Sequence, residues 1–351
     1  MKLAMLKRFF RIVIKIVVAL LVVVGVLCVI YRDLVGYGLR QAKGQLTIVR
    51  KAKPVEEYLS DPAFPDSLKQ KLLLIAEARQ FAINSLGLND TKNYTTMYDQ
   101  QGKEIMWVVT ASEPFQLKEK EWKFPVVGAM PYKGYFDEAR ARAEQKQLED
   151  EGWDVNVRNP GGWSTLGWFT DPILSNMLSR SEGDLVSLII HEMVHATIFV
   201  KDSVDFNENL ASFIGDRGAE QFLISKYGKD SEPYHQFVQE DKEYINYVDH
   251  ILRGCVYLDS VYAAMADKPV EEKKQLKEAA ILKIMETADT LSFDALIRPG
   301  SKHKTLPNNA YFMSFRRYQS RQDVFHDEWQ QNFRGDLKAY ILYLADRYPF
   351  L

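Results

Sequence analysis

The sequence predicts an α+β protein, in which a mostly helical domain with a small β-sheet follows one N-terminal transmembrane helix. Three observations predict this fold: a basic N-terminus followed by an apolar run, a stretch rich in strand-forming residues at about 90–170, and helical periodicity at about 171–351. We therefore expect an anchor at 1–35 and a domain at 36–351, with the sheet in its first part and the helices in its second.

The composition excludes several classes of protein. Hydrophobic residues make up 46% of the 351 residues and aromatic residues 12%, which is ample for a packed core and excludes global disorder. The formal net charge of −2 gives no overall field that would attract nucleic acid, so we expect no nucleic-acid partner. Two cysteines, Cys28 and Cys255, are too few for a disulfide framework.

The N-terminus has the pattern of a membrane anchor. Basic residues precede an apolar run at Ile16–Tyr31: Lys2, Lys7, Arg8, Arg11 and Lys15. Counted from Ile12, the run reaches 20 residues, which is long enough to span a bilayer. No small-x-small cleavage site follows, which favours an uncleaved anchor, and Leu27 argues against a lipoprotein signal at Cys28. The positive-inside rule then predicts a single-pass membrane protein with its domain on the extracytoplasmic (periplasmic) side.

The elements before Asp171 alternate between helical and extended patterns. Residues 52–67 predict a proline-punctuated linker and 68–88 a helix. Two strands around the polar turn DQQGKE predict a hairpin at 94–112. After the extended segment FPVVGAMPYKGYF, we expect a solvated helix ending at Gly152, and then two strands around a Pro-Gly-Gly turn in WDVNVRNPGGWSTLGWF.

From Asp171 onward the pattern is almost entirely helical. The apolar segment DLVSLIIHEMVHATIFV predicts one helix, and the next is expected to begin at the cap residue Asn207 and to stop at a glycine. Further helices are expected at Glu232–Ala264, Val270–Leu291, Asn308–Trp329 and Asp336–Tyr348.

The motif His191-Glu192-x-x-His195 carries the chemistry of this sequence. Residues four apart on a helix share a face, so the two imidazoles can reach one point and bind Zn²⁺. Glu192 is rotated by about 100° around the helix, where its carboxylate can take a proton from zinc-bound water. This is the metalloprotease pattern. The flanking residues are apolar on nearly every side, and burying these three side chains without partners would cost several kcal/mol.

The third metal ligand has several candidates. Ile198 and Lys201 stand where a metzincin would need Gly and His, which excludes that class. We expect the motif helix to run about five residues past His195 and the loop KDSVDF to turn the chain back, so that Glu208 approaches the histidines. Asp202 and Asp205 are the alternatives for an aspartate-type site. Two core histidines without a metal are the remaining possibility.

Several segments are similar to those of a known family. GYGLRQAKGQLTIVRKAKPV, FPVVGAMPYKGYFD, STLGWFTDPILSNML, LIIHEMVHATIFVKDSVDFNENLASFIG and LPNNAYFMSFRRY resemble, in order, the segments of the bacterial predicted-aminopeptidase family, a group of membrane-associated, gluzincin-like HExxH proteins. The words NENLA resemble the NExxA pattern with which gluzincins supply a glutamate ligand, although the spacer of twelve residues between His195 and Glu208 is short for that group. The resemblance implies a gluzincin-like zincin fold and zinc-dependent peptidase chemistry, with an aminopeptidase as the family's own designation.

Carried onto this sequence, the resemblance makes His191, His195 and Glu208 the zinc ligands and Glu192 the general base. Family members often carry a lipoprotein signal, from which this chain departs at Leu27. The implied partners are a peptide or protein substrate and the membrane. A non-catalytic envelope protein with a structural metal or a structural helix pair is the alternative, and a metal-dependent hydrolase of a non-peptide bond is a third.

Residues outside the motif give weaker signals. Tyr318 is a candidate donor to the oxyanion of the transition state, beside Tyr311, Arg316 and Arg317. Ser212 or Asp216 is a candidate for orienting a ligand histidine. Trp163–Trp168 is a candidate strand edge for binding an extended substrate. The natural substrate, the exo- or endopeptidase preference and the oligomeric state do not follow from the sequence.

Overall fold

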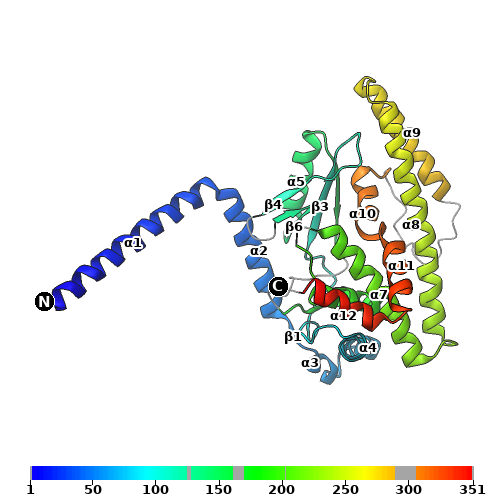
Figure 1. The fold of residues 1–351 in the computed structure, drawn as a ribbon, viewed down its shortest axis with the longest axis horizontal. Coiled ribbons are helices and arrows are strands. Elements are labelled where there is room, and N and C mark those ends of the chain that lie inside the picture. The colour runs from blue at the N-terminus through cyan, green and yellow to red at the C-terminus, as the bar shows by residue number, and fades with distance from the viewer. Residues whose placement is uncertain (1, 125–127, 161–169, 202, 289–305, 350–351) are drawn as a thin grey trace. The chain divides into compact units, whose positions relative to one another are not determined.

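The computed structural model describes residues 2–124, 128–160, 170–201, 203–288 and 306–349 (Figure 1). The chain divides into two compact units, Met1–Arg50 and Lys51–Leu351. The described part is mostly helical with small β-sheets, as the sequence predicts. The domain boundary predicted after residue 35 stays a prediction.

The first unit consists of α1 (Lys2–Ile30) and most of α2 (Arg32–Lys51). Residues Phe9–Ile30 of α1 are long and apolar enough to cross a membrane, and those of their apolar side chains that the structure describes are exposed. An N-terminal signal sequence has the same length and composition. The prediction of one apolar N-terminal helix is therefore confirmed, and its role is treated below as a proposal.

The second unit begins with short helices and β-strands. Its elements up to the motif helix are β1 (Lys53–Pro54), α3 (Val55–Ser60), α4 (Asp66–Phe81), the π-helix η1 (Ala82–Leu86), β2 (Thr96–Tyr98), β3 (Trp107–Ser112), β4 (Trp122–Phe124), β5 (Gly128–Met130), β6 (Tyr132–Tyr135), α5 (Glu138–Asp150), β7 (Asp154–Arg158), β8 (Ile173–Leu174) and the 3₁₀-helix η2 (Ser175–Ser179). The stretch predicted as a linker therefore contains α3. Helix α5 matches its prediction: Asp137 caps it, and Gly152 follows it with a φ of +90°.

The strands that the structure describes form three small sheets rather than one. Their orders are β1-β2-β8, β6-β3-β7 and β4-β5. The predicted hairpin at 94–112 is wrong, because β2 pairs with β1 and β8 whereas β3 pairs with β6 and β7. The turn between them is present, with Gln101 and Gly102 at positive φ, but the strands leave it toward different partners. The second strand expected after the Pro-Gly-Gly turn lies outside the described residues.

The elements that the structure describes in the rest of the second unit are helices. They are α6 (Glu182–His195), α7 (Val204–Tyr227), α8 (Glu232–Ala264), α9 (Val270–Ala288), α10 (Asn309–Gln319), α11 (Gln322–Phe333) and α12 (Leu337–Arg347). Figure 1 shows α8 and α9 running side by side. The single helix predicted at Asn308–Trp329 is two helices, because the chain turns at Ser320 and Arg321 between α10 and α11.

Helices α6 and α7 pack closely because of two glycines on α7. A Cβ atom on Gly215 would lie 2.9 Å from the Ser187 carbonyl oxygen and 3.2 Å from the His191 Cβ. A Cβ atom on Gly218 would lie 3.0 Å from Ile190. The absence of these Cβ atoms lets α7 approach the motif face of α6. Most other α6 residues are buried, as its apolar sequence predicts.

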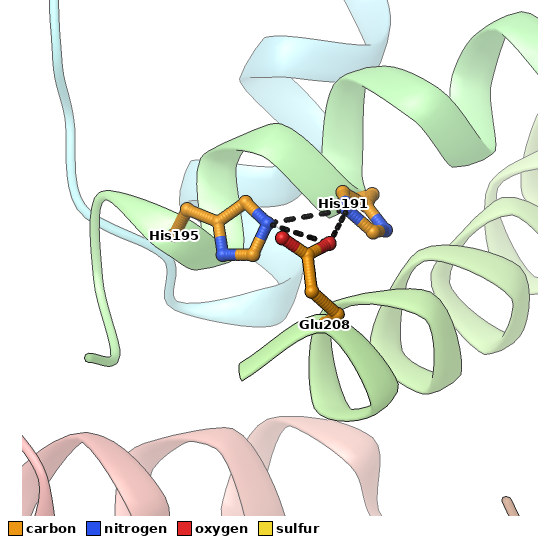
Figure 2. A group of neighbouring side chains, drawn as sticks. All are labelled: His191, His195 and Glu208. Atoms are coloured by element: carbon orange, nitrogen blue, oxygen red, sulfur yellow. Dashed lines mark hydrogen bonds and ion pairs between the residues drawn. The ribbon is translucent and has the colours of Figure 1, made fainter. Parts of the chain in front are cut away.

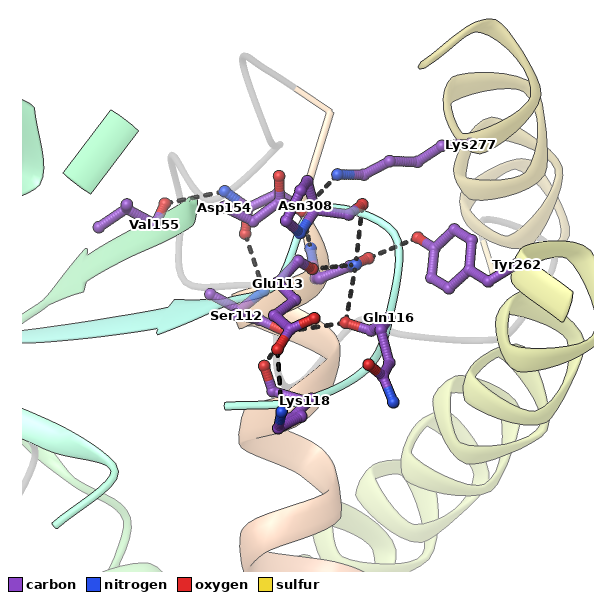
Figure 3. A network of polar contacts seen from close by, with 12 residues as sticks. Ser112, Glu113, Gln116, Lys118, Asp154, Val155, Tyr262, Lys277 and Asn308 are labelled. Carbon is purple, nitrogen blue, oxygen red and sulfur yellow. Dashed lines mark hydrogen bonds and ion pairs between the residues drawn. The ribbon is translucent and has the colours of Figure 1, made fainter. Parts of the chain in front are cut away.

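The start of α10 is held by a buried polar network (Figure 3). Asn309 donates from its side chain to the Glu113 carbonyl oxygen at 2.9 Å, and its Oδ1 accepts from the Tyr262 hydroxyl at 2.6 Å. Asp154 accepts a hydrogen bond from the Asn309 backbone N–H at 2.8 Å and also pairs with Lys277. These contacts join α10 to the strand that precedes Glu113, to β7 and to helices α8 and α9.

The end of α10 is tied to α7 through Asn209, which is 0% exposed. Its side chain donates to the Asp205 carbonyl oxygen at 2.8 Å and to the Arg317 carbonyl oxygen, and it accepts from the Arg321 backbone N–H at 2.9 Å. The Arg317 side chain in turn pairs with Glu119. Asn209 therefore fixes the turn of α7 that carries Glu208 against the junction of α10 and α11.

Candidate metal centre

The motif helix α6 ends at His195, which corrects the expectation that it continues for about five more residues. Thr197 donates its hydroxyl to the Met193 carbonyl oxygen at 2.9 Å, and the Asn89 side chain donates to the Ala196 carbonyl oxygen at 3.0 Å. Groups from outside the helix thus satisfy the last carbonyls, and the chain can turn immediately after the second histidine.

Helix α7 begins at Val204, three residues before the predicted cap Asn207. Instead of capping the helix, the Asn207 side chain accepts from the Val200 backbone N–H at 2.9 Å and donates to the Val200 carbonyl oxygen at 2.8 Å. This pair of hydrogen bonds closes the connection between α6 and α7. The closed connection brings Glu208, in the second turn of α7, back to the histidines of α6.

Three side chains converge between α6 and α7 (Figure 2). The Nε2 atoms of His191 and His195 lie 3.2 Å apart. The Glu208 Oε2 lies 3.5 Å from the His191 Nε2 and 3.6 Å from the His195 Nε2. These residues form a group of possible metal ligands whose donor atoms all lie within 4.8 Å of one another. The side chains of all three are largely buried.

The spacing of these donor atoms suits a zinc ion. Zinc binds imidazole nitrogen and carboxylate oxygen at about 2.0–2.2 Å in tetrahedral geometry, which places neighbouring donors about 3.3 Å apart. The three observed separations, from 3.2 to 3.6 Å, are close to that value. One point can therefore lie at bonding distance from all three atoms without a large movement of either helix.

The charges of the group also favour a cation. Burial disfavours the charged form of Glu208, but His195 and His191 outweigh it and hold the pKa of this carboxyl well below its usual range. Burial likewise opposes protonation of His195, yet the Glu208 carboxylate, and more weakly Glu192, raise the pKa of its imidazole. The carboxylate thus attracts positive charge to the point where the two imidazole nitrogens meet.

Glu192 lies on the same helix but outside this group. It is 7% exposed, and burial raises the pKa of its carboxyl, although His191 and His195 act in the opposite direction. Among the residues that the structure describes, none donates a hydrogen bond to the Glu192 carboxylate. The Glu192 carboxylate is therefore not one of the clustered donor groups.

Ser212 and Asp216, the two candidates for orienting His191, make different contacts in the structure. The Ser212 hydroxyl lies 3.5 Å from the His191 Nδ1, at the outer limit of a hydrogen bond. Asp216 instead accepts from the Ser187 hydroxyl at 2.7 Å. Burial, and next the Asp241 carboxylate, raise the pKa of Asp216 to about 6. Ser212 is thus the nearer of the two to His191.

The other candidate residues from the sequence lie outside the group of three or outside the described part of the chain. Asp205 lies in the first turn of α7, outside the group of three, and Asp202 and Trp163–Trp168 lie outside the described residues. Tyr318 is on α10, but its side chain lies outside the described part. Tyr311 contacts Tyr247 through its hydroxyl.

Two arginines beside Tyr318 are engaged elsewhere. Arg316 pairs with Asp259, and the buried Arg317 pairs with Glu119. Asn89 and Asn209 were not singled out from the sequence, because isolated Asn residues carry no spacing signal.

The fold and this group of residues define an α+β protein with an apolar N-terminal helix and a buried His-His-Glu cluster that can hold a metal ion. The sequence model of the family described as "Putative aminopeptidase" matches residues 36–345. The chain therefore belongs to this family, as its recurring segments indicate. No curated protein and no solved structure matches the chain.

Proposed function

We propose that the chain is a membrane-anchored, zinc-dependent peptidase of the gluzincin type, and an aminopeptidase. The observation that carries this proposal is the convergence of the His191, His195 and Glu208 donor atoms at separations of 3.2–3.6 Å. The family membership supports aminopeptidase activity through the family's description.

The number of ligands favours a catalytic site over a structural one. Structural zinc sites are closed by four protein ligands, whereas catalytic sites have three and keep one position for water or substrate. Among the described residues, the group has three members. This count supports the peptidase rather than the alternative of a non-catalytic envelope protein.

The reaction assigns separate roles to the residues of α6 and α7. When bound, zinc makes water more acidic and polarises the peptide carbonyl. His191, His195 and Glu208 would hold the ion. The Glu192 carboxylate takes a proton from the attacking water and delivers it to the leaving amine as the C–N bond breaks.

The proposed location rests on the N-terminal helix and its basic head. The 22 residues Phe9–Ile30 would span the membrane with the basic head on the cytoplasmic side, which leaves the peptidase domain in the periplasm of a bacterial cell. In intact spheroplasts, added protease reaches only the outer surface of the cytoplasmic membrane. It should nevertheless digest the domain. Full protection of the domain in intact spheroplasts would contradict this orientation.

The activity is tested with the purified full-length protein and a panel of fluorogenic aminoacyl and blocked endopeptide substrates. We expect hydrolysis of aminoacyl substrates, loss of activity after treatment with a chelator, and recovery after addition of one equivalent of Zn²⁺. Cleavage that survives complete metal removal would contradict the zinc mechanism. A zinc-loaded protein that cleaves no member of the panel would favour the non-catalytic alternative, and preferential cleavage of blocked peptides would contradict an aminopeptidase.

A further inference from the structure

The position of Glu208 depends on how the first turns of α7 are held. The close contacts that Gly215 and Gly218 make with α6 lie about two to three turns after Glu208 along α7. Contacts in the middle of a helix leave its first turns able to tilt. The turn that carries Glu208 therefore needs a support of its own.

Asn209, the residue after Glu208, provides this support. Its side-chain amide donates to the carbonyl oxygen of Arg317, in the last turn of α10. Its Oδ1 accepts from the backbone N–H of Arg321, directly before α11, at 2.9 Å. The Gln322 side chain donates to the Asn209 carbonyl oxygen at 3.0 Å. The side chain and the backbone of Asn209 are thus both bound to the junction of α10 and α11.

The hydrogen bonds of the Asn209 side chain satisfy groups at two helix ends. The last carbonyls of a helix and the N–H groups at its start have no partners within that helix. Asn209 binds one such carbonyl of α10 and one such N–H at the start of α11. Because Asn209 is 0% exposed, water cannot take over these bonds if its side chain is removed. Three helices are therefore joined at one buried point.

Aromatic contacts lie on either side of this point. Phe206 and Phe213 are about one turn before and one turn after Asn209 on α7. Their ring centroids lie 5.6 Å and 6.1 Å from that of Phe325 on α11. Apolar contacts hold two helices together but have no preferred direction, whereas hydrogen bonds do. Asn209 therefore fixes the register of α7 on α11 within this aromatic contact.

Asn209 and Glu208 serve different sides of α7, because successive residues of a helix are about 100° apart. Asn209 binds the junction of α10 and α11, whereas Glu208 lies beside His191 and His195 of α6 (Figure 2). Metal–ligand distances tolerate deviations of only about 0.2 Å. A small tilt of α7 would therefore be enough to move the Glu208 carboxylate out of place, and the bonds of Asn209 oppose such a tilt.

We propose that Asn209 is a positioning residue for the candidate metal centre. Its hydrogen bonds to the ends of α10 and α11 hold the first turns of α7, so that the Glu208 carboxylate stays beside the nitrogens of His191 and His195 before a metal ion arrives. Asn209 acts only through Glu208. This inference rests on the proposed function, because it concerns a ligand of the same metal ion.

The test compares Asn209→Ala with a matched variant, Asn309→Ala, in the full-length protein. Asn309 is also 0% exposed, and it anchors the other end of α10 by donating to the Glu113 carbonyl oxygen and accepting from the Tyr262 hydroxyl. Both variants remove a buried amide and leave its partners unsatisfied, so both should lower the thermal unfolding midpoint of the metal-free protein. For each protein, the Kd for Zn²⁺ is measured by competition with a chromophoric chelator, well below the unfolding midpoint.

We expect Asn209→Ala to bind Zn²⁺ about 10–100-fold more weakly, as is typical when a group that supports a metal ligand is removed. Asn309→Ala should bind Zn²⁺ within about twofold of the wild type, even where its loss of stability is as large. A wild-type Kd in Asn209→Ala would overturn the inference. Equal weakening in both variants would also overturn it, because it indicates a general effect of lost stability.

A milder variant decides the question if Asn209→Ala does not fold. Gln322→Ala removes only the hydrogen bond to the Asn209 carbonyl oxygen. It should weaken Zn²⁺ binding about twofold to fivefold, in line with the loss of one hydrogen bond, and an unchanged Kd would overturn the inference. A wild-type protein that binds no Zn²⁺, or binds it and cleaves no peptide, would instead refute the proposed function itself.

Discussion

Glu192→Gln is expected to abolish peptide hydrolysis while zinc stays bound. Glutamine has the size of glutamate but cannot accept the proton of water, and removal of a general base typically lowers a rate by about 10²–10⁴-fold. Glu192 lies outside the group of three donor atoms, so the metal content should not change. The measurement is kcat/KM on the best aminoacyl substrate, together with the zinc content of the same sample.

The matched control for this variant is Glu278→Gln, which makes the same change at an exposed position of α9. It should retain wild-type activity and zinc content. If Glu192→Gln kept full turnover, Glu192 would not be the base. If it lost zinc together with activity, Glu192 would belong to the coordination sphere, and the division of roles along α6 would be wrong.

Glu208→Gln is expected to weaken zinc binding more than any other substitution considered. A neutral amide is a poor zinc ligand, and it would remove the only carboxylate of the group. Even changes to groups that merely support a ligand weaken metal binding by 10–100-fold, so loss of the ligand itself should weaken it by more than about a hundredfold. Activity should fall in parallel and return only at high zinc concentration. The measurement is a competition titration against a chromophoric zinc chelator.

The variant Asp205→Asn tests whether the third metal ligand is an aspartate rather than Glu208. Asp205 lies one turn before Glu208 on the same helix and is the described alternative for an aspartate-type site. The variant should keep wild-type zinc affinity, because Asp205 lies outside the group of three donor residues. Loss of zinc in Asp205→Asn combined with normal binding in Glu208→Gln would replace the glutamate by the aspartate as the third ligand.

The helices and the motif could be predicted because they depend on local patterns. Periodicity and capping signals gave the bounds of α8 (Glu232–Ala264) without error and the end of α5 within two residues. The spacing of His191 and His195 required only that their segment be helical. Glu208 needed a further step, since its position depends on how the chain turns after α6, and the structure brings it to the histidines.

The features that could not be predicted depend on contacts between distant residues. The strands β2 and β3 flank a good turn sequence, yet each finds its partners elsewhere in the chain. Asn207 has the composition of a helix cap, but its side chain instead binds Val200 across the connection between α6 and α7. Asn89 gave no signal, because its side chain binds the Ala196 carbonyl oxygen, which lies 107 residues away in the sequence.

The coordination of the metal is tested most directly by anomalous diffraction at the zinc absorption edge from crystals of the zinc-loaded protein. The account predicts one strong peak between α6 and α7, about 2.0–2.2 Å from the His191 Nε2, the His195 Nε2 and an oxygen of Glu208. No peak at that point, or a fully occupied zinc ion elsewhere in the protein, would contradict it.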